Sequence, residues 1–158
     1  MRILGIDPGY GIVGFGLIEL KGLDWTMVDC GVIETEAGLE FPQRLEQIYE
    51  DLKLLVKEFK PDLVAIEEIF FMQNVSTGIE VSEARGVILL ALTQAGLPIY
   101  EYAPNEVKAS ITGYGQADKI QMQNMVQTYL NLSRRPQPDD AADALAIALT
   151  CGFQVVQV

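Results

Sequence analysis

The sequence predicts one α/β domain, with a mixed five-stranded sheet that carries helices on both of its faces. Three strand-like segments joined by short turns open the chain, which is the pattern of an antiparallel meander. Helical segments then alternate with short apolar strands, which indicates parallel pairing through crossover helices. The chain has 158 residues, 49% of them hydrophobic, so it can bury one core, and we expect a single domain over residues 1–158.

The meander is predicted from the segments Arg2–Asp7, Ile12–Leu20 and Trp25–Thr35. Gly14 and Gly16 lie two residues apart in the second of these strands, so one of its faces lacks side chains there. We therefore expect another element of the protein to approach that bare face closely.

Helices and strands alternate in the rest of the chain. Apolar residues recur at helical spacing from Pro42 to Lys60, and Pro61 ends that helix. The remaining predicted elements are a strand at Leu63–Ile66, a loop at Ile69–Gly78, a helix at about Glu80–Ala95, a strand at Leu97–Tyr102, a short helix at Pro104–Ile111, and helices at Asp118–Leu130 and Asp139–Cys151.

The middle of the helix at about Glu80–Ala95, from Val87 to Leu92, is apolar on every side. Such a segment must be buried on two faces, and we expect a second copy of the chain to cover one of them. We therefore expect a homodimer that is built through this helix.

The net charge is −11, from 22 acidic and 11 basic residues. An acidic total opposes binding to nucleic acids, although the local patch matters more than the sum. No apolar run approaches the roughly 20 residues that a membrane helix needs, and no signal peptide is visible. We therefore expect a cytoplasmic protein with no membrane partner, in which Cys30 and Cys151 are reduced thiols.

Four acidic residues from three separate segments are expected to meet. Asp7 and Glu67 each follow a short apolar strand, and the carboxyl ends of parallel strands share one edge of a sheet. Asp140 and Asp143 lie three residues apart, on one face of the last helix. Glu68 points to the opposite side of its strand from Glu67 and is the weaker candidate.

The chain contains no histidine, which excludes a Ser-His-Asp triad, an imidazole base and a zinc site with histidine ligands. Clustered carboxylates repel one another unless a cation or a proton lies between them. Carboxylates alone suit a hard cation such as Mg²⁺. The sequence therefore predicts a site for phosphoryl transfer, in which two Mg²⁺ ions activate a water molecule and stabilise the leaving oxygen.

Simpler interpretations exist for each of these acidic residues. Asp139 or Asp140 could cap the last helix, and Glu67 with Glu68 could be ordinary surface charge. Asp7-Pro8-Gly9 is by itself a common turn. The combination of the three segments favours the metal site, but it leaves open whether Asp139 or Asp140 is the ligand.

Five segments, taken in order along the chain, resemble the RuvC family of bacterial Holliday-junction resolvases. They are Gly5-Ile6-Asp7-Pro8-Gly9, Ala65-Ile66-Glu67, Glu83-Ala84-Arg85-Gly86, Gly113-Tyr114-Gly115-Gln116-Ala117-Asp118-Lys119 and Asp140-Ala141-Ala142-Asp143-Ala144-Leu145-Ala146. The resemblance implies an RNase H-like fold, a homodimer, and cutting of two opposed strands of a four-way DNA junction with Mg²⁺ or Mn²⁺. The sequence does not tell whether a branch-migration motor complex is a further partner.

The resemblance also assigns roles to single residues. The catalytic metal ligands would be Asp7, Glu67, Asp140 and Asp143, and the DNA contacts would be Phe70, Arg85, Lys108 and Lys119. Both lysines could instead be surface residues. Phe70 could belong to the core, and Arg85 could be a buried structural cation.

Two other functions fit parts of the sequence. A YqgF-like nuclease of the RNase H fold acts on RNA and shares the opening Gly-Ile-Asp strand, but the segments at 113–119 and 140–146 fit the resolvase better. An inactive, dimeric DNA-binding paralogue is the second alternative, and the intact set of four acids argues against it.

Overall fold

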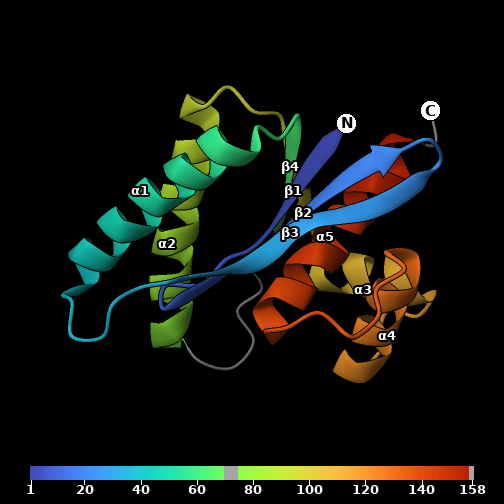
Figure 1. The fold of residues 1–158 in the computed structure, drawn as a ribbon. Helices are drawn as coiled ribbons and strands as arrows, with labels where there is room; N and C mark the ends of the chain where they lie inside the picture. Colours follow the sequence, from blue (N-terminus) through green and yellow to red (C-terminus); the bar gives the residue numbers. More distant parts are fainter. Residues whose placement is uncertain (70–74, 157–158) are drawn as a thin grey trace.

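A five-stranded sheet lies between two layers of helices in the computed structural model, which describes residues 1–69 and 75–156 (Figure 1). The strands are β1 (Arg2–Asp7), β2 (Ile12–Lys21), β3 (Asp24–Glu34), β4 (Leu63–Glu67) and β5 (Ile99–Tyr102). The helices are α1 (Phe41–Phe59), α2 (Val75–Gln94), α3 (Pro104–Thr112), α4 (Lys119–Tyr129) and α5 (Asp139–Val155). Within the described ranges, no helix is both long enough and apolar enough to span a membrane.

The order of the strands is β3-β2-β1-β4-β5. β1, β2 and β3 pair in antiparallel fashion, whereas β4 is parallel to β1 and β5 is parallel to β4. This arrangement confirms the predicted mixed sheet with an antiparallel meander. Ile6 pairs with Ile66, so Asp7 and Glu67 follow at the same edge of the sheet.

Alternation of side chains along the strands divides the core into two halves. Leu4 and Ile6 face α1 and α2, while Ile3 and Ala65 lie on the opposite side, under α3, α4 and α5. Figure 1 shows these two layers of helices on opposite faces of the sheet.

Glycine in β2 lets α5 lie directly on the sheet. A Cβ atom at Gly14 would lie 2.1 Å from the carbonyl oxygen of Asp140, and Leu145 fills the space beside Gly16. The close approach that the two glycines predict is therefore made by α5, the helix that carries two of the four acids.

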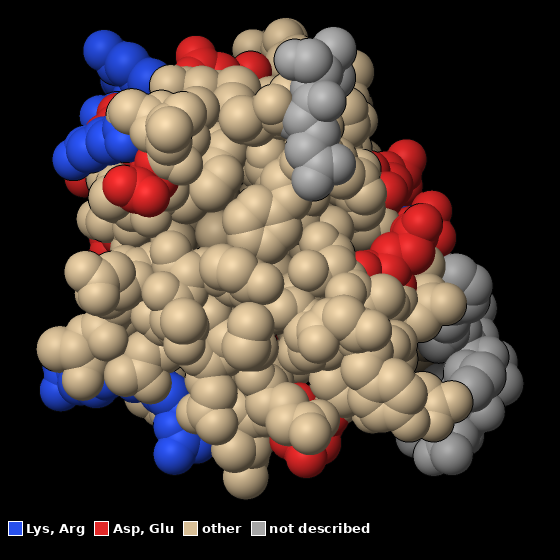
Figure 2. All heavy atoms as spheres, turned by 90° about the vertical axis from the view of Figure 1, so that its right-hand side faces the viewer, with Lys and Arg blue, Asp and Glu red and all other residues tan. Residues whose placement is uncertain are grey.

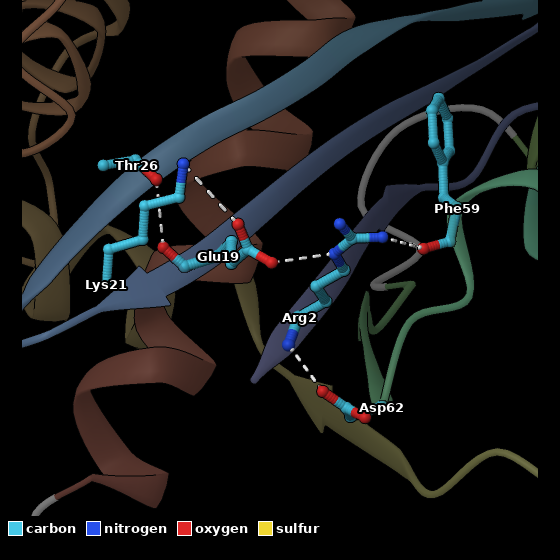
Figure 3. Close-up of polar contacts among 6 residues, drawn as sticks. All are labelled: Arg2, Glu19, Lys21, Thr26, Phe59 and Asp62. Atoms are coloured by element: carbon cyan, nitrogen blue, oxygen red, sulfur yellow. Dashed lines mark hydrogen bonds and ion pairs between the residues drawn. The ribbon is translucent and has the colours of Figure 1, made fainter.

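The amino-terminal end of β1 is held by a set of polar contacts (Figure 3). The guanidinium of Arg2 donates to the Glu19 carboxylate at 3.0 Å and to the Phe59 carbonyl at 2.9 Å, and its backbone N–H donates to Asp62 at 2.7 Å. Arg2, Glu19 and Asp62 therefore each have a hydrogen-bonded partner at this end of the strand.

The prediction of a loop over Ile69–Gly78 was wrong at its carboxyl end, because α2 already begins at Val75. Ser, Thr and Gly at positions 76–78 favour turns when considered alone. Burial of Ala84, Ile88 and Leu92 against the sheet stabilises a longer helix than that local preference predicts. The last helix also extends past the predicted end at Cys151, since Phe153 packs edge-on against Tyr129.

Candidate active site

A cavity of about 360 Å³ opens at the edge of the sheet where β1 and β4 end. Asp7, Glu67 and Asp143 line it, and so do Lys108 of α3 and Lys119 of α4. Its other lining residues are Pro104, Val107, Ala117, Asp118, Met122 and Ala146. Three of the four predicted acids and both predicted lysines therefore share one cavity, although they come from five elements of the chain.

The pKa values of two of these acids show how closely the charges are placed. Burial, and then the charges of Glu67, Asp143 and Asp140, raise the pKa of Asp7 to about 8, while Lys119 opposes the rise. Burial and the charge of Asp143 raise the pKa of Glu67 to about 7, against the effect of Lys108. The acids destabilise one another's ionised forms, as carboxylates do when they share a site without a compensating cation.

Asp140 lies beside Asp7 but outside the lining of the cavity. Its backbone packs against Gly14, which is the partner of Asp7 in the pairing of β1 with β2. Its charge raises the pKa of Asp7, which agrees with this placement. The geometry thus brings all four predicted acids together, with Asp140 at the margin of the group.

Asp139 belongs to a different set of contacts. It accepts a hydrogen bond from the amide of Gln123 at 2.9 Å and pairs with Lys119 at 3.2 Å. Pro138, and not Asp139, occupies the capping position of α5, so the capping interpretation was wrong for both aspartates. Both aspartates instead lie in the first turn of α5, where their carboxylates interact favourably with the helix dipole.

Lys119 joins the two groups of acids, because its ammonium also lies 3.5 Å from the Asp143 carboxylate. Desolvation works against the charge of Lys119, but the hydrogen bond that its ammonium donates to Asp139 and the charges of Asp143 and Asp139 raise its pKa. Gln123 is a functional candidate that the sequence did not suggest. It is a buried polar residue on the apolar face of α4, and that mismatch was the only available signal.

The other predicted DNA contacts fall in different places. Arg85 donates to the carbonyl oxygen of Glu67 at 3.1 Å and pairs with the Glu101 carboxylate, and its side chain is only 16% exposed. It therefore connects α2 to the ends of β4 and β5, which is a structural position. Phe70 lies outside the described residues.

The donor set fits a hard divalent cation, since four carboxylates meet there and three of them, Asp7, Glu67 and Asp143, have raised pKa values. Within residues 1–69 and 75–156, no three acidic or cysteine side chains are already close enough together to form a complete metal site. Small movements of the acidic side chains toward a cation would relieve their mutual repulsion.

A family model described as crossover junction endodeoxyribonuclease RuvC matches residues 3–151. The chain belongs to the RuvC family. A RuvC from Thermotoga petrophila is 55% identical over 148 residues, which cover 94% of this chain and 90% of that protein. The matched range contains all four acids and both lysines of the cavity.

Solved structures of RuvC agree with this assignment. The Thermus thermophilus RuvC structure has a TM-score of 0.91 and 34% identity, and the match covers 99% of this chain and 96% of that one. Thermus thermophilus RuvC in complex with a Holliday junction substrate has a TM-score of 0.92 and 35% identity over the same shares. The predicted RNase H-like architecture is therefore confirmed as that of RuvC.

Proposed function

We propose that this protein is a Holliday-junction resolvase, an endonuclease that cuts opposed strands of a four-way DNA junction. The convergence of Asp7, Glu67, Asp140 and Asp143 at one edge of the sheet, in a chain of the RuvC family, carries the proposal. The RuvC structure from Thermus thermophilus in complex with a Holliday junction substrate supports the choice of DNA. The alternatives of an RNA nuclease and of an inactive paralogue are not favoured.

The acidic and basic residues of the site have different roles. Asp7, Glu67, Asp140 and Asp143 would hold the divalent ions, for which Mg²⁺ is proposed, with two ions in each site and Mn²⁺ as a substitute. Bound there, the ions would supply an activated water and neutralise charge on the leaving oxygen. Lys108 and Lys119 project into the same cavity from two helices, where they can orient and neutralise the scissile phosphate.

Although the net charge is acidic, one broad face of the protein has few charged side chains and can approach DNA. Residues 109–117, 120–133 and 144–156, which belong to α3, α4, α5 and their connections, include no charged side chain. Figure 2 shows this face with uncharged atoms over most of its area and with acidic and basic side chains near its margins. Repulsion between DNA and the acidic residues is weakest where charges are absent, which supports an approach over this side.

A homodimer through α2 is a further part of the proposal. Ala84 and Ile88 of this helix are buried against the sheet, whereas Ile79 and Leu90 are each 53% exposed. Ile79, Gly86 and Leu90 follow one another at spacings of seven and four residues, so they share the outer face. An exposed apolar stripe of this kind is covered by a partner in many dimers, and a second copy would place two active sites on one junction.

A cleavage assay with a panel of substrates tests the activity. The protein is incubated with a four-way DNA junction, a linear DNA duplex and a four-way RNA junction, in Mg²⁺, Mn²⁺ or EDTA. We expect paired nicks in the DNA junction alone, and only with a divalent ion. Preferential cutting of RNA would favour the YqgF-like alternative, and junction binding without any nicking would favour the inactive paralogue.

Light scattering tests the dimer separately. We expect a dimer at micromolar concentration and a monomer for Leu90→Glu. Leu89 is a useful comparison position, because it packs partly against the core of the same subunit and its substitution would lower stability instead. A monomeric unaltered protein would contradict the proposed assembly.

A further inference from the structure

We propose that Arg134 and Arg135 form a second DNA-binding subsite outside the active-site cavity, which takes phosphodiester groups of a junction arm. This inference rests on the proposed function and adds to it a place where the backbone of the substrate is held. Both arginines lie in the segment between α4 and α5, at positions 130–138, just before the helix that carries Asp140 and Asp143.

The two arginines line a groove of about 360 Å³ that is separate from the cavity of the acids. Met27 and Cys30 of β3 form one side of it, and residues 132–137 form the other. Arg134 and Arg135 are exposed at this groove, while Met27, Cys30 and Leu132 are partly buried and pack against the core. The groove thus combines an apolar floor with a cationic rim.

A β-bulge in β3 creates this floor. Leu17 pairs with Asp29 and Ile18 pairs with Met27, so Val28 is an extra residue in the edge strand. Met27 and Cys30 are three positions apart and would face opposite sides of a regular strand. Because the extra residue resets the alternation, both side chains lie on the side of the sheet that α5 covers.

The charges of the arginines are available for a ligand. Within the ranges that the structure describes, no acidic side chain pairs with Arg134 or Arg135, whereas Arg2, Arg85 and Lys119 each have an acidic partner. The carboxylate of Asp29, which is next to Cys30, accepts a hydrogen bond from the backbone N–H of Cys30. In a protein of net charge −11, two adjacent cations without acidic partners form a local site of the sign that phosphate needs.

The sequence around the arginines strengthens this interpretation. They are the only charged residues between Ile120 and Pro138, so no acid of that segment offsets them. The planar guanidinium donates in a fork that matches two phosphate oxygens, and a pair of arginines can hold neighbouring phosphates of one strand. Two arginines could also bind an acidic peptide. We propose DNA as the ligand because the proposed substrate carries phosphates along its whole length.

The spacing along the chain places this subsite within reach of a bound junction. Arg135 precedes Asp140 by five residues, which limits the distance between their Cα atoms to about 18 Å, at about 3.6 Å per residue. At 3.4 Å of rise per nucleotide, that distance corresponds to about five steps along one DNA strand. When one strand is cut at the cavity, phosphates of the same strand several nucleotides from the cut can therefore lie at the arginines.

A comparison of two charge-matched double variants tests the subsite. Arg134→Gln with Arg135→Gln and Lys53→Gln with Lys57→Gln each remove two positive charges, the second pair from a groove between α1 and α2 on the other face of the sheet. Both are made in an Asp7→Asn background, so that the junction is not cut. The affinity for a four-way DNA junction is measured by fluorescence anisotropy at several salt concentrations.

We expect the arginine variant to bind the junction at least about 10-fold more weakly at low salt. The slope of log affinity against log salt should become shallower by about 1.8, at about 0.9 for each of two lost phosphate contacts. The lysine variant should retain both values within two-fold. Arg134→Lys with Arg135→Lys, which keeps the charge, should restore most of the slope, whereas a merely structural role would not respond to charge in this way.

The same variants separate this inference from the proposed function. In the active protein we expect the arginine substitutions to act mainly on KM, because the subsite lies apart from the reacting atoms. Equal losses in the arginine and lysine variants, or an unchanged slope in the arginine variant, would overturn the subsite and leave the nuclease in place. Failure of the unaltered protein to bind a DNA junction would overturn both.

Discussion

The two ends of β1 use charge in opposite ways. At the amino-terminal end, the side chain of Arg2 donates hydrogen bonds to Glu19 and the Phe59 carbonyl, and its backbone N–H donates to Asp62 (Figure 3). At the carboxyl-terminal end, five residues along the strand from Arg2, Asp7 meets Glu67 and the aspartates of α5, and the charges of Lys119 and Lys108 oppose this repulsion without cancelling it. One end of the strand gains stability from its charges, and the other end loses it.

This difference indicates which end evolved for function. A paired charge, such as Glu19 with Arg2, has its pKa lowered chiefly by the hydrogen bond from the arginine. An unpaired cluster of acids, such as Asp7 with Glu67, has raised pKa values and weakens the fold until a cation binds. The position of unfavourable charge in this sheet therefore marks the candidate active site without reference to any relative.

The largest expected effect comes from substitution of the acids at the carboxyl-terminal end, which should abolish most of the cleavage activity. Asp7→Asn, Glu67→Gln, Asp140→Asn and Asp143→Asn should each lower the cleavage rate by about 10³-fold or more, because a missing ligand misplaces a metal ion. Junction binding, measured in the same preparations by anisotropy, should stay within a few-fold of the unaltered protein.

Asp139→Asn is the matched control for this series. It weakens the contacts with Gln123 and Lys119 but leaves the four acids intact, so we expect a smaller loss of rate than for Asp140→Asn. Full activity in Asp140→Asn, together with a large loss in Asp139→Asn, would show that the ligand of this pair is Asp139.

The second prediction concerns the packing that brings α5 to the end of β1. Gly14→Ala should lower the free energy of unfolding by about 2–4 kcal/mol, because its Cβ would lie 2.1 Å from the Asp140 carbonyl oxygen and α5 would have to move. Urea denaturation followed by circular dichroism measures the loss. Gly22→Ala tests glycine loss without crowding, since no atom lies within 4 Å of its Cβ position although its φ of 66° adds backbone strain. A smaller loss at Gly14 than at Gly22 would contradict the argument from packing.

The third prediction tests the cost of the acidic cluster directly. Without divalent ions at pH 8, Asp7→Asn should raise the free energy of unfolding by about 1–2 kcal/mol, since it removes one repelling charge. The pKa of Asp7 is about 8 in the folded protein, against an ordinary value of 3.8, so the folded state keeps a proton that the unfolded chain releases. Its contribution to stability therefore falls as the pH rises from about 4 to about 8.

Thermal unfolding in EDTA between pH 5 and pH 9 measures this effect. The gain from Asp7→Asn should be small at pH 5 and largest near pH 8 and above. A variant that is less stable than the unaltered protein at pH 8 would show that Asp7 makes favourable contacts that outweigh the repulsion.

The smallest expected effect concerns the amino-terminal end of β1. Arg2→Ala should lower the free energy of unfolding by about 1 kcal/mol, through loss of the contacts with Glu19 and the Phe59 carbonyl, and should leave the cleavage rate unchanged. Lys21→Ala is the control, because its contact with Glu19 is longer, at 3.7 Å, and its side chain is 66% exposed. Chemical denaturation of both variants should show almost no change for Lys21→Ala.

Much of the fold and of the acidic site was predictable from the sequence, because it follows from local periodicity. The alternation of side chains along Arg2–Asp7 and Leu63–Glu67 places Asp7 and Glu67 on one face, and the parallel pairing of these strands brings them to one edge. The spacing of Asp140 and Asp143 likewise follows from the helical repeat. The bare face of Gly14 and Gly16 predicted a close contact, although not the helix that makes it.

Tertiary structure alone decided the contacts between residues that no local pattern relates. The pairing of Asp139 with Lys119 and Gln123 depends on how α4 packs against α5, and the place of Arg85 depends on where α2 crosses the end of β4. The groove at Arg134 and Arg135 depends on the bulge at Val28, which reverses the alternation on which strand predictions depend. Periodicity determines which face of an element a side chain occupies, but only the packing of the elements determines which side chains of different elements meet.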